Sequence, residues 1–253
     1  MTTTPHSQRR AAGVLLAAGP AVLLLVEFIS AAAWTDPPYS YTYNFISNLG
    51  VRGPSTLFGQ YMASPLYWLM NTGFIVFGIV IFAGVTLLKG LSGTRRLAVM
   101  TAALLLAVGG VLLGLFPGSG ESLNDGSGEF HTLGAFGGFL SGNVLAIMLG
   151  RMHSRIGLSK GTGRALVAVG AVGLLATITY VLVLVNGGET VGIIGLIERG
   201  ATHPFLVGTL YAGLSLVRQQ SRRDPSAAAV VRQAPPVDAI ADSPVHRAPD
   251  PTA

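Results

Sequence analysis

Six long apolar runs constrain this sequence more than any other feature. A helix rises about 1.5 Å per residue, so about 20 apolar residues cross the roughly 30 Å hydrocarbon core of a bilayer. The runs that reach this length cover residues 11–34, 62–88, 97–116, 131–150, 165–186 and 194–217. Only 11% of the 253 residues are charged, against about 25% in soluble domains. The sequence therefore predicts an all-α polytopic membrane protein with a bundle of six transmembrane helices over residues 11–218.

Lysine and arginine residues cluster in alternate connections between these runs. They precede the first run, fill the second and fourth connections and follow the sixth run, whereas only Arg52 and Arg199 fall on the opposite side. In membrane proteins the cytoplasmic connections carry the excess of lysine and arginine. We therefore expect both termini to be cytoplasmic. The net charge of +5 reflects this topology, and no nucleic-acid partner is expected.

The two ends of the chain differ from the apolar region. Residues 1–10 are expected to form a short cytoplasmic tail. Residues 219–253 are rich in proline and alanine and lack periodicity, which predicts a disordered cytoplasmic tail. The N-terminal arginines, apolar stretch and small residues also resemble a cleavable signal peptide. That apolar run is longer than a signal core and contains Glu27, which favours a first helix that is retained.

Polar residues gather on the side opposite the basic connections. The first run is followed by YTYNFISNLG, residues 41–50, where tyrosines alternate with other residues. Such tyrosines suit the aromatic belt at the headgroup level of a membrane. Asn44, Ser47 and Asn48 follow, and we expect Ser47 or Asn48 to cap a short helix or to line a pocket.

Four ionisable residues are expected at similar depth near the outer ends of the runs. Glu27 shares a helical face with small residues, which mark helix-packing seams, so its carboxylate is expected to point into the bundle. His131 opens the fourth run, and Arg199 and His203 lie one turn apart in the sixth. Two alternatives stay open, namely histidines that are only polar helix ends and a protonated Glu27 bonded to a neighbour.

Convergence of these groups would allow three kinds of site. The first hypothesis is a pocket for a lipid headgroup or small ligand, with Glu27, Asn44, Ser47, Asn48, His131, Glu198, Arg199 and His203 as candidates. The second is a metal-dependent lipid hydrolase, in which Glu27, His131 and His203 bind zinc and Ser47 polarises the substrate. The third is a haem held by the two histidines.

Other features limit these hypotheses. The set lacks a third histidine, and the chain has no cysteine. The sequence contains no GxSxG, P-loop or dinucleotide-binding motif, so it assigns no catalytic residue and no cofactor. The absence of an internal sequence repeat, together with few polar residues inside the runs, disfavours a transporter.

Short motifs occur in a definite order along the chain: ISNLG after the first run, LGLFPGSG and GEFHTLGAFGGF around the third connection, and GLIERGATHPF in the sixth run. In this order they resemble the DUF998 family of bacterial and archaeal six-span membrane proteins. The resemblance covers about residues 10–218 and implies a six-span fold in a bacterial-type plasma membrane, without implying a reaction. It marks as family-pattern positions Ser47, Leu49, Gly50, Pro117, His131, Glu198 and Arg199. Asn48 stands where the pattern often has aspartate, which weakens a metal or acid–base role there.

Overall fold

The computed structural model describes residues 5–188 and 191–223. Its six long helices are α1 (Pro5–Ala33), α2 (Tyr67–Thr86), α3 (Gly93–Leu115), α5 (Ser127–Arg151), α7 (Lys160–Val185) and α8 (Ile194–Arg223). Each predicted apolar run overlaps one of these helices. Helix α8 continues past residue 218, where the membrane domain was predicted to end. The rest of the predicted tail, 224–253, lies outside the described residues.

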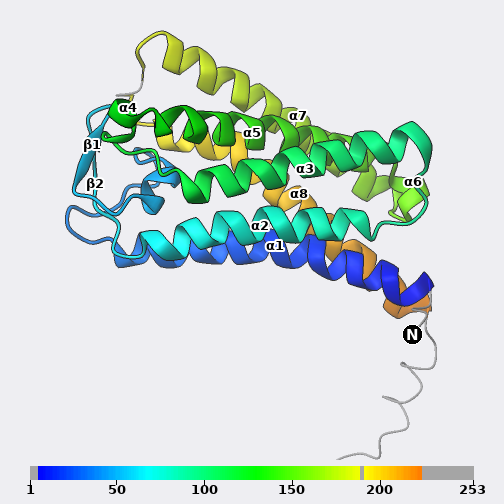
Figure 1. Cartoon of the computed structure of the whole chain (residues 1–253). Coiled ribbons are helices and arrows are strands. Elements are labelled where there is room, and N and C mark those ends of the chain that lie inside the picture. Colours follow the sequence, from blue (N-terminus) through cyan, green and yellow to red (C-terminus); the bar gives the residue numbers. More distant parts are fainter. Residues whose placement is uncertain (1–4, 189–190, 224–253) are drawn as a thin grey trace, which may run out of the picture.

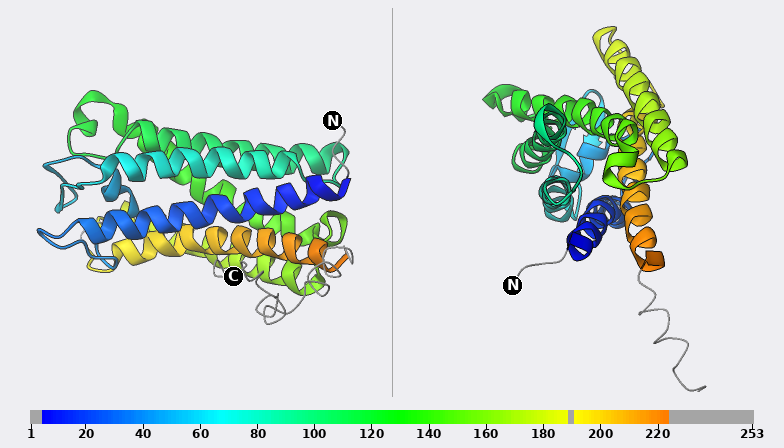
Figure 2. Two further views of the ribbon diagram at one scale, coloured as in Figure 1. Left: turned by 90° about the horizontal axis from the view of Figure 1, so that it is seen from below. Right: turned by 90° about the vertical axis from the view of Figure 1, so that its right-hand side faces the viewer.

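The long helices form a closed ring (Figures 1 and 2). Each helix packs against the next along the chain, in the order α1, α2, α3, α5, α7 and α8, and α8 packs back against α1. Helices α5 and α8 also contact each other across the ring. The start of α1 and the end of α8 lie at the same end of the bundle, beside the short helix α6 (His153–Ile156). The ring therefore brings the first and last helices of the chain side by side.

Five of the helices are long and apolar enough to cross a membrane: α1, α2, α3, α5 and α7. Large apolar side chains also cover their outer surfaces, for example Phe28 on α1 and Leu175 on α7, each about two-thirds exposed (64% and 66%). Helix α8 has the length of a span, but it is not among the five in the described residues. Polar residues along it, including Glu198, Arg199 and His203, lower its mean hydropathy. The sixth span thus remains a prediction.

Small residues let neighbouring helices approach closely. Where α1 meets α8, a Cβ added to Gly213 would lie 2.5 Å from the carbonyl oxygen of Gly13, so only glycine fits at this position. Such close backbone contact is the usual way in which helices associate in lipid, where apolar burial gives little driving force. The sequence expectation that small residues mark packing seams agrees with this contact.

One end of the bundle is covered by ordered loops, and we call it the loop-capped end. It contains the 3₁₀ helix η1 (Ile46–Gly50), the hairpin of β1 (Ser55–Leu57) and β2 (Gln60–Met62), and the short helix α4 (Ser122–Asp125). The hydroxyl of Ser55 donates to Glu121 Oε2 (2.8 Å) and accepts from the amide of Gly120 (2.8 Å). These bonds join the hairpin to the connection between α3 and α5, so the two loops form one cover.

Candidate functional site

Arg199 is the centre of a buried polar cluster at the loop-capped end. Its side chain is 5% exposed, and its Nε donates to Glu27 Oε1 on α1 (3.0 Å). One terminal nitrogen donates to the carbonyl oxygens of Tyr41 (2.7 Å), Asn44 (3.0 Å) and Gly195 (3.1 Å). The other donates to the hydroxyl of Tyr39. A buried guanidinium is tolerated only when its donors are used in this way.

Two tyrosine rings complete the surroundings of Arg199. Its guanidinium carbon lies 4.9 Å from the ring centre of Tyr41 and 5.6 Å from that of Tyr39, within the range of cation–π attraction. Tyr39 also donates its hydroxyl to the carbonyl oxygen of Phe45 (2.9 Å). These tyrosines therefore hold the loop against Arg199. Tyr41 is 41% exposed, and the aromatic belt stays a prediction.

Glu27 and His203 form the second half of this cluster. His203 Nε2 lies 2.9 Å from Glu27 Oε2, so each carboxylate oxygen of Glu27 has its own partner. Glu27 is 4% exposed at the side chain, whereas His203 is 34% exposed at the edge of the bundle. The expectation that Glu27 points into the bundle agrees with these contacts. Both oxygens of Glu27 are occupied by protein groups, which makes this cluster a structural tie between α1, α8 and the loop.

Glu198 and Gln60 hold η1 in place. Glu198 Oε2 accepts from the backbone amide of Ile46. Gln60, 1% exposed on β2, accepts at Oε1 from the amide of Phe45 (3.3 Å) and from the Nδ2 of Asn48, and it donates from Nε2 to the carbonyl oxygen of Tyr43 (2.8 Å). Asn44 Oδ1 accepts from the amide of Ser40 (2.8 Å) and shapes the preceding turn. Sequence reasoning missed Gln60, because a glutamine in a short outer loop gives no signal of burial.

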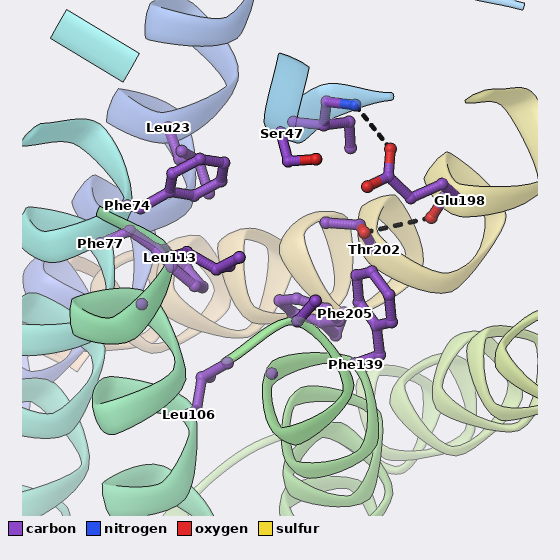
Figure 3. Close-up of a pocket in the computed structure, with 14 residues that line it drawn as sticks. Leu23, Ser47, Phe74, Phe77, Leu106, Leu113, Phe139, Glu198, Thr202 and Phe205 are labelled. Atoms are coloured by element: carbon purple, nitrogen blue, oxygen red, sulfur yellow. Dashed lines mark hydrogen bonds between the residues drawn. The ribbon is translucent and has the colours of Figure 1, made fainter. Parts of the chain in front are cut away.

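A cavity of about 260 Å³ lies beneath the loops. Its polar wall is formed by Ser47, Asn48, His131 and Glu198, and its apolar wall includes Phe45 and Phe136. Ser47 and Glu198 also line a smaller and almost entirely apolar pocket of about 40 Å³ that reaches inward between the helices. Figure 3 shows Ser47 and Glu198 on one side of the inner pocket, with Leu23 and Phe74 across from Ser47 and with Phe139 and Phe205 below. The inner walls include Leu23, Phe74, Phe77, Leu106, Leu113, Phe139 and Phe205.

Two polar side chains of the cavity wall, Glu198 and His131, each have an atom without a hydrogen-bond partner among the described residues. Glu198 is 5% exposed, and in the described part of the chain only its Oε2 has a hydrogen-bond partner. His131 Nδ1 lies 2.8 Å from the carbonyl oxygen of Phe116. A carbonyl oxygen only accepts, so Nδ1 carries the proton and Nε2 of the neutral ring is an acceptor. Nε2 lies beside Gly118, at which an added Cβ would come within 2.7 Å of it.

The candidate residues thus divide between two places. Glu27, Arg199 and His203 meet in the buried cluster, and the Asn44 carbonyl oxygen joins them. Ser47, Asn48, His131 and Glu198 line the cavity. The sequence left open whether Ser47 caps a short helix or lines a pocket. In the structure it lines the cavity, and η1 has no side-chain cap. His131 is not in the Glu27 cluster, because its Nδ1 is held by the loop that follows α3.

The residues present do not assemble the predicted zinc set. Over residues 5–188 and 191–223, no group of three or more histidines, aspartates or glutamates lies close enough together to hold a metal ion. Glu27 and His203 pair with each other, whereas His131 lines the cavity, to which His203 does not contribute. The haem hypothesis meets the same difficulty, since the two imidazoles face different surroundings. The residues present therefore fit neither the predicted zinc ion nor the haem.

These observations define a class of protein: a mostly α-helical protein with several membrane-spanning helices and a loop cover at one end. A family model described as "Protein of unknown function (DUF998)" matches residues 11–216, which is most of the chain. The chain belongs to this family, and the resemblance of the three motifs is confirmed. Comparison with curated proteins and with solved structures gave no match.

Proposed function

We propose that this chain is a six-span protein of a bacterial plasma membrane, with α8 as the sixth span and both termini in the cytoplasm. The pairing of α8 with both α1 and α7 supports its assignment as a span, because it completes the ring. The basic connections at the end beside α6 support a cytoplasmic position for that end. The loop-capped end then faces outward, and the cavity opens near the outer surface of the membrane.

We further propose that the cavity binds the polar headgroup of a membrane lipid. The observation that carries this proposal is the carboxylate of Glu198, which is buried and leaves Oε1 directed at the cavity. In the described residues Oε1 has no hydrogen-bond partner, so a donor in the cavity would complete the hydrogen bonding of this carboxylate. A headgroup with hydrogen-bond donors meets this requirement.

The surroundings of the cavity suit a ligand that is polar at one end and apolar at the other. A groove on the outer side of α4 and α5 shares Ser122, Leu123 and Thr132 with the cavity. Leu123 is 64% exposed and Leu133, on the same groove, is 63% exposed. These apolar side chains give an acyl chain a path from the cavity to the surrounding lipid.

The test is lipid retention by the purified protein, measured by native mass spectrometry after mild detergent extraction. We expect the wild-type protein to carry a bound lipid and the Ser47→Trp variant, in which the new ring fills the cavity, to lose it. The matched control is Ser154→Trp, because Ser154 is exposed on α6 at the opposite end of the bundle. A wild-type protein without bound lipid, or equal retention in both variants, would contradict the proposal.

A further inference from the structure

The open polar atoms in the cavity wall are mainly acceptors. Glu198 offers Oε1, and His131 offers Nε2 because its Nδ1 carries the proton. Asn48, 2% exposed, donates one N–H of Nδ2 to Gln60 Oε1, which leaves the carbonyl oxygen Oδ1 as an acceptor and the second N–H as a donor. A carboxylate, an imidazole nitrogen and an amide oxygen thus line one space.

Two hydroxyl donors in the same wall already have a protein acceptor, and two others can act either as donor or as acceptor. The hydroxyl of Ser122 donates to the carbonyl oxygen of Ser119 (2.6 Å), and the hydroxyl of Thr132 donates to that of Gly128 (2.9 Å). The hydroxyls of Ser47 and Tyr180 can donate or accept. No lysine or arginine is among the residues that line this cavity. The cavity therefore needs a ligand that supplies hydrogen-bond donors.

We propose that the cavity selects a headgroup that ends in a primary ammonium, an inference that rests on the lipid-binding function proposed above. A primary ammonium carries three donors and a positive charge, which suit a wall whose open atoms are mainly acceptors and include the carboxylate of Glu198. A quaternary ammonium has the charge but no N–H donor. A headgroup without a cation, such as phosphoglycerol, has a net negative charge, which would be repelled by Glu198 and would find no basic side chain in this wall.

Among the described residues, no charged side chain forms a hydrogen bond with Oε1 of Glu198. Arg199 is next to it in the chain, but the guanidinium is directed to Glu27, to the loop carbonyls and to Tyr39. Its Nε and both terminal nitrogens are used in these bonds, and Arg199 does not line the cavity. Glu198 is thus the acidic side chain of the cavity wall, and its open oxygen is the expected partner of the ammonium group.

The experiment compares lipids that have the same acyl chains and differ only in the headgroup. The protein, stripped of lipid in detergent, is offered phosphatidylethanolamine, phosphatidylcholine and phosphatidylglycerol in turn, and the bound fraction is read by native mass spectrometry. We expect the ethanolamine lipid to be retained about tenfold more than either of the others, as charge-assisted hydrogen bonds give preferences of this size. Glu198→Gln should bring the three lipids to similar retention.

The control variant is Asp36→Asn, which removes one carboxylate from an exposed position in the loop between α1 and η1, outside the cavity wall. It should keep the preference for the ethanolamine lipid. Equal retention of all three lipids by the wild-type protein would overturn the headgroup inference and leave the lipid-binding proposal standing. No retention of any lipid would overturn both. Should Glu198→Gln fail to fold, the comparison of the three lipids on the wild-type protein still decides the inference.

Discussion

Arg199 on α8 donates from Nε to Oε1 of Glu27 on α1 over 3.0 Å, and the two side chains are about 5% exposed (5% and 4%). They lie 172 residues apart in the chain. This contact joins the first and last helices of the ring at the loop-capped end. Because Arg199 also binds two loop carbonyls, the same side chain fixes the position of the segment that leads to η1.

Removal of one partner of this pair should destabilise the protein strongly. Arg199→Met leaves the buried carboxylate of Glu27 with His203 alone, and the loss expected for a broken buried pair is about 3–5 kcal/mol. The double variant Glu27→Leu/Arg199→Met should cost less than the sum of the single variants, because no charge is left unpaired. Thermal unfolding in detergent measures both effects. Arg52→Met is the control, since Arg52 is exposed; an equal loss there would count against this explanation.

Gln60 should stabilise the loop between α1 and α2, as Arg199 does. Gln60→Leu removes the acceptor of the Phe45 amide and of Asn48, together with the donor to Tyr43. Each buried polar group left without a partner costs about 1–3 kcal/mol. We expect faster limited proteolysis between residues 35 and 66 at unchanged helix content. Tyr61→Leu, on the same strand but exposed, should digest at the wild-type rate.

A methyl group at Gly118 should close part of the cavity. Gly118→Ala would place a Cβ 2.7 Å from His131 Nε2, so the imidazole must move and weaken its bond to Phe116. We expect reduced lipid retention with a stability loss of about 0.5–1.5 kcal/mol, the value of one hydrogen bond. Gly137→Ala is the matched control because no atom lies within 4 Å of its added Cβ. Unchanged retention in Gly118→Ala would argue against a ligand beside His131.

Tyr39 gives a prediction for alkaline pH. Burial raises the pKa of Tyr39 above its ordinary value of 10.0, although Arg199 opposes the shift. A raised pKa means that folding favours the neutral phenol, so its stabilising contribution is complete below pH 10 and declines as the pH rises further. Tyr39→Phe should be less stable at neutral pH but lose less stability between about pH 10 and 12. Parallel pH profiles of unfolding for the two proteins would contradict this.

The orientation of the bundle can be measured because the natural chain has no cysteine. We expect Asn124→Cys, exposed on α4, to react in intact cells with a thiol reagent that does not cross membranes. Arg95→Cys, exposed near the start of α3 at the other end, should react only after the cells are opened. The opposite pattern would invert the proposed topology and move the cavity to the cytoplasmic side.

The helices could be predicted from sequence because length and apolarity are local properties. The pairing of Glu27 with Arg199 and His203 was also within reach, since their distances from the ends of the runs placed them at similar depth. The exclusion of His131 from that cluster was not, because it depends on a bond to the backbone of Phe116. The role of Tyr39 depends likewise on how the loop folds around Arg199. Such contacts arise from tertiary folding and leave no periodic pattern.

The closed ring sets an order of events during biosynthesis. Glu27 belongs to the first candidate span, and an ionised side chain inside a membrane helix is costly unless it finds a partner. Arg199 leaves the ribosome only after α2, α3, α5 and α7 have been made. Glu27 is therefore without the guanidinium of Arg199 during most of translation. A chain truncated before α8 would leave Glu27 without Arg199 and His203. We expect cellular quality control to degrade such a chain.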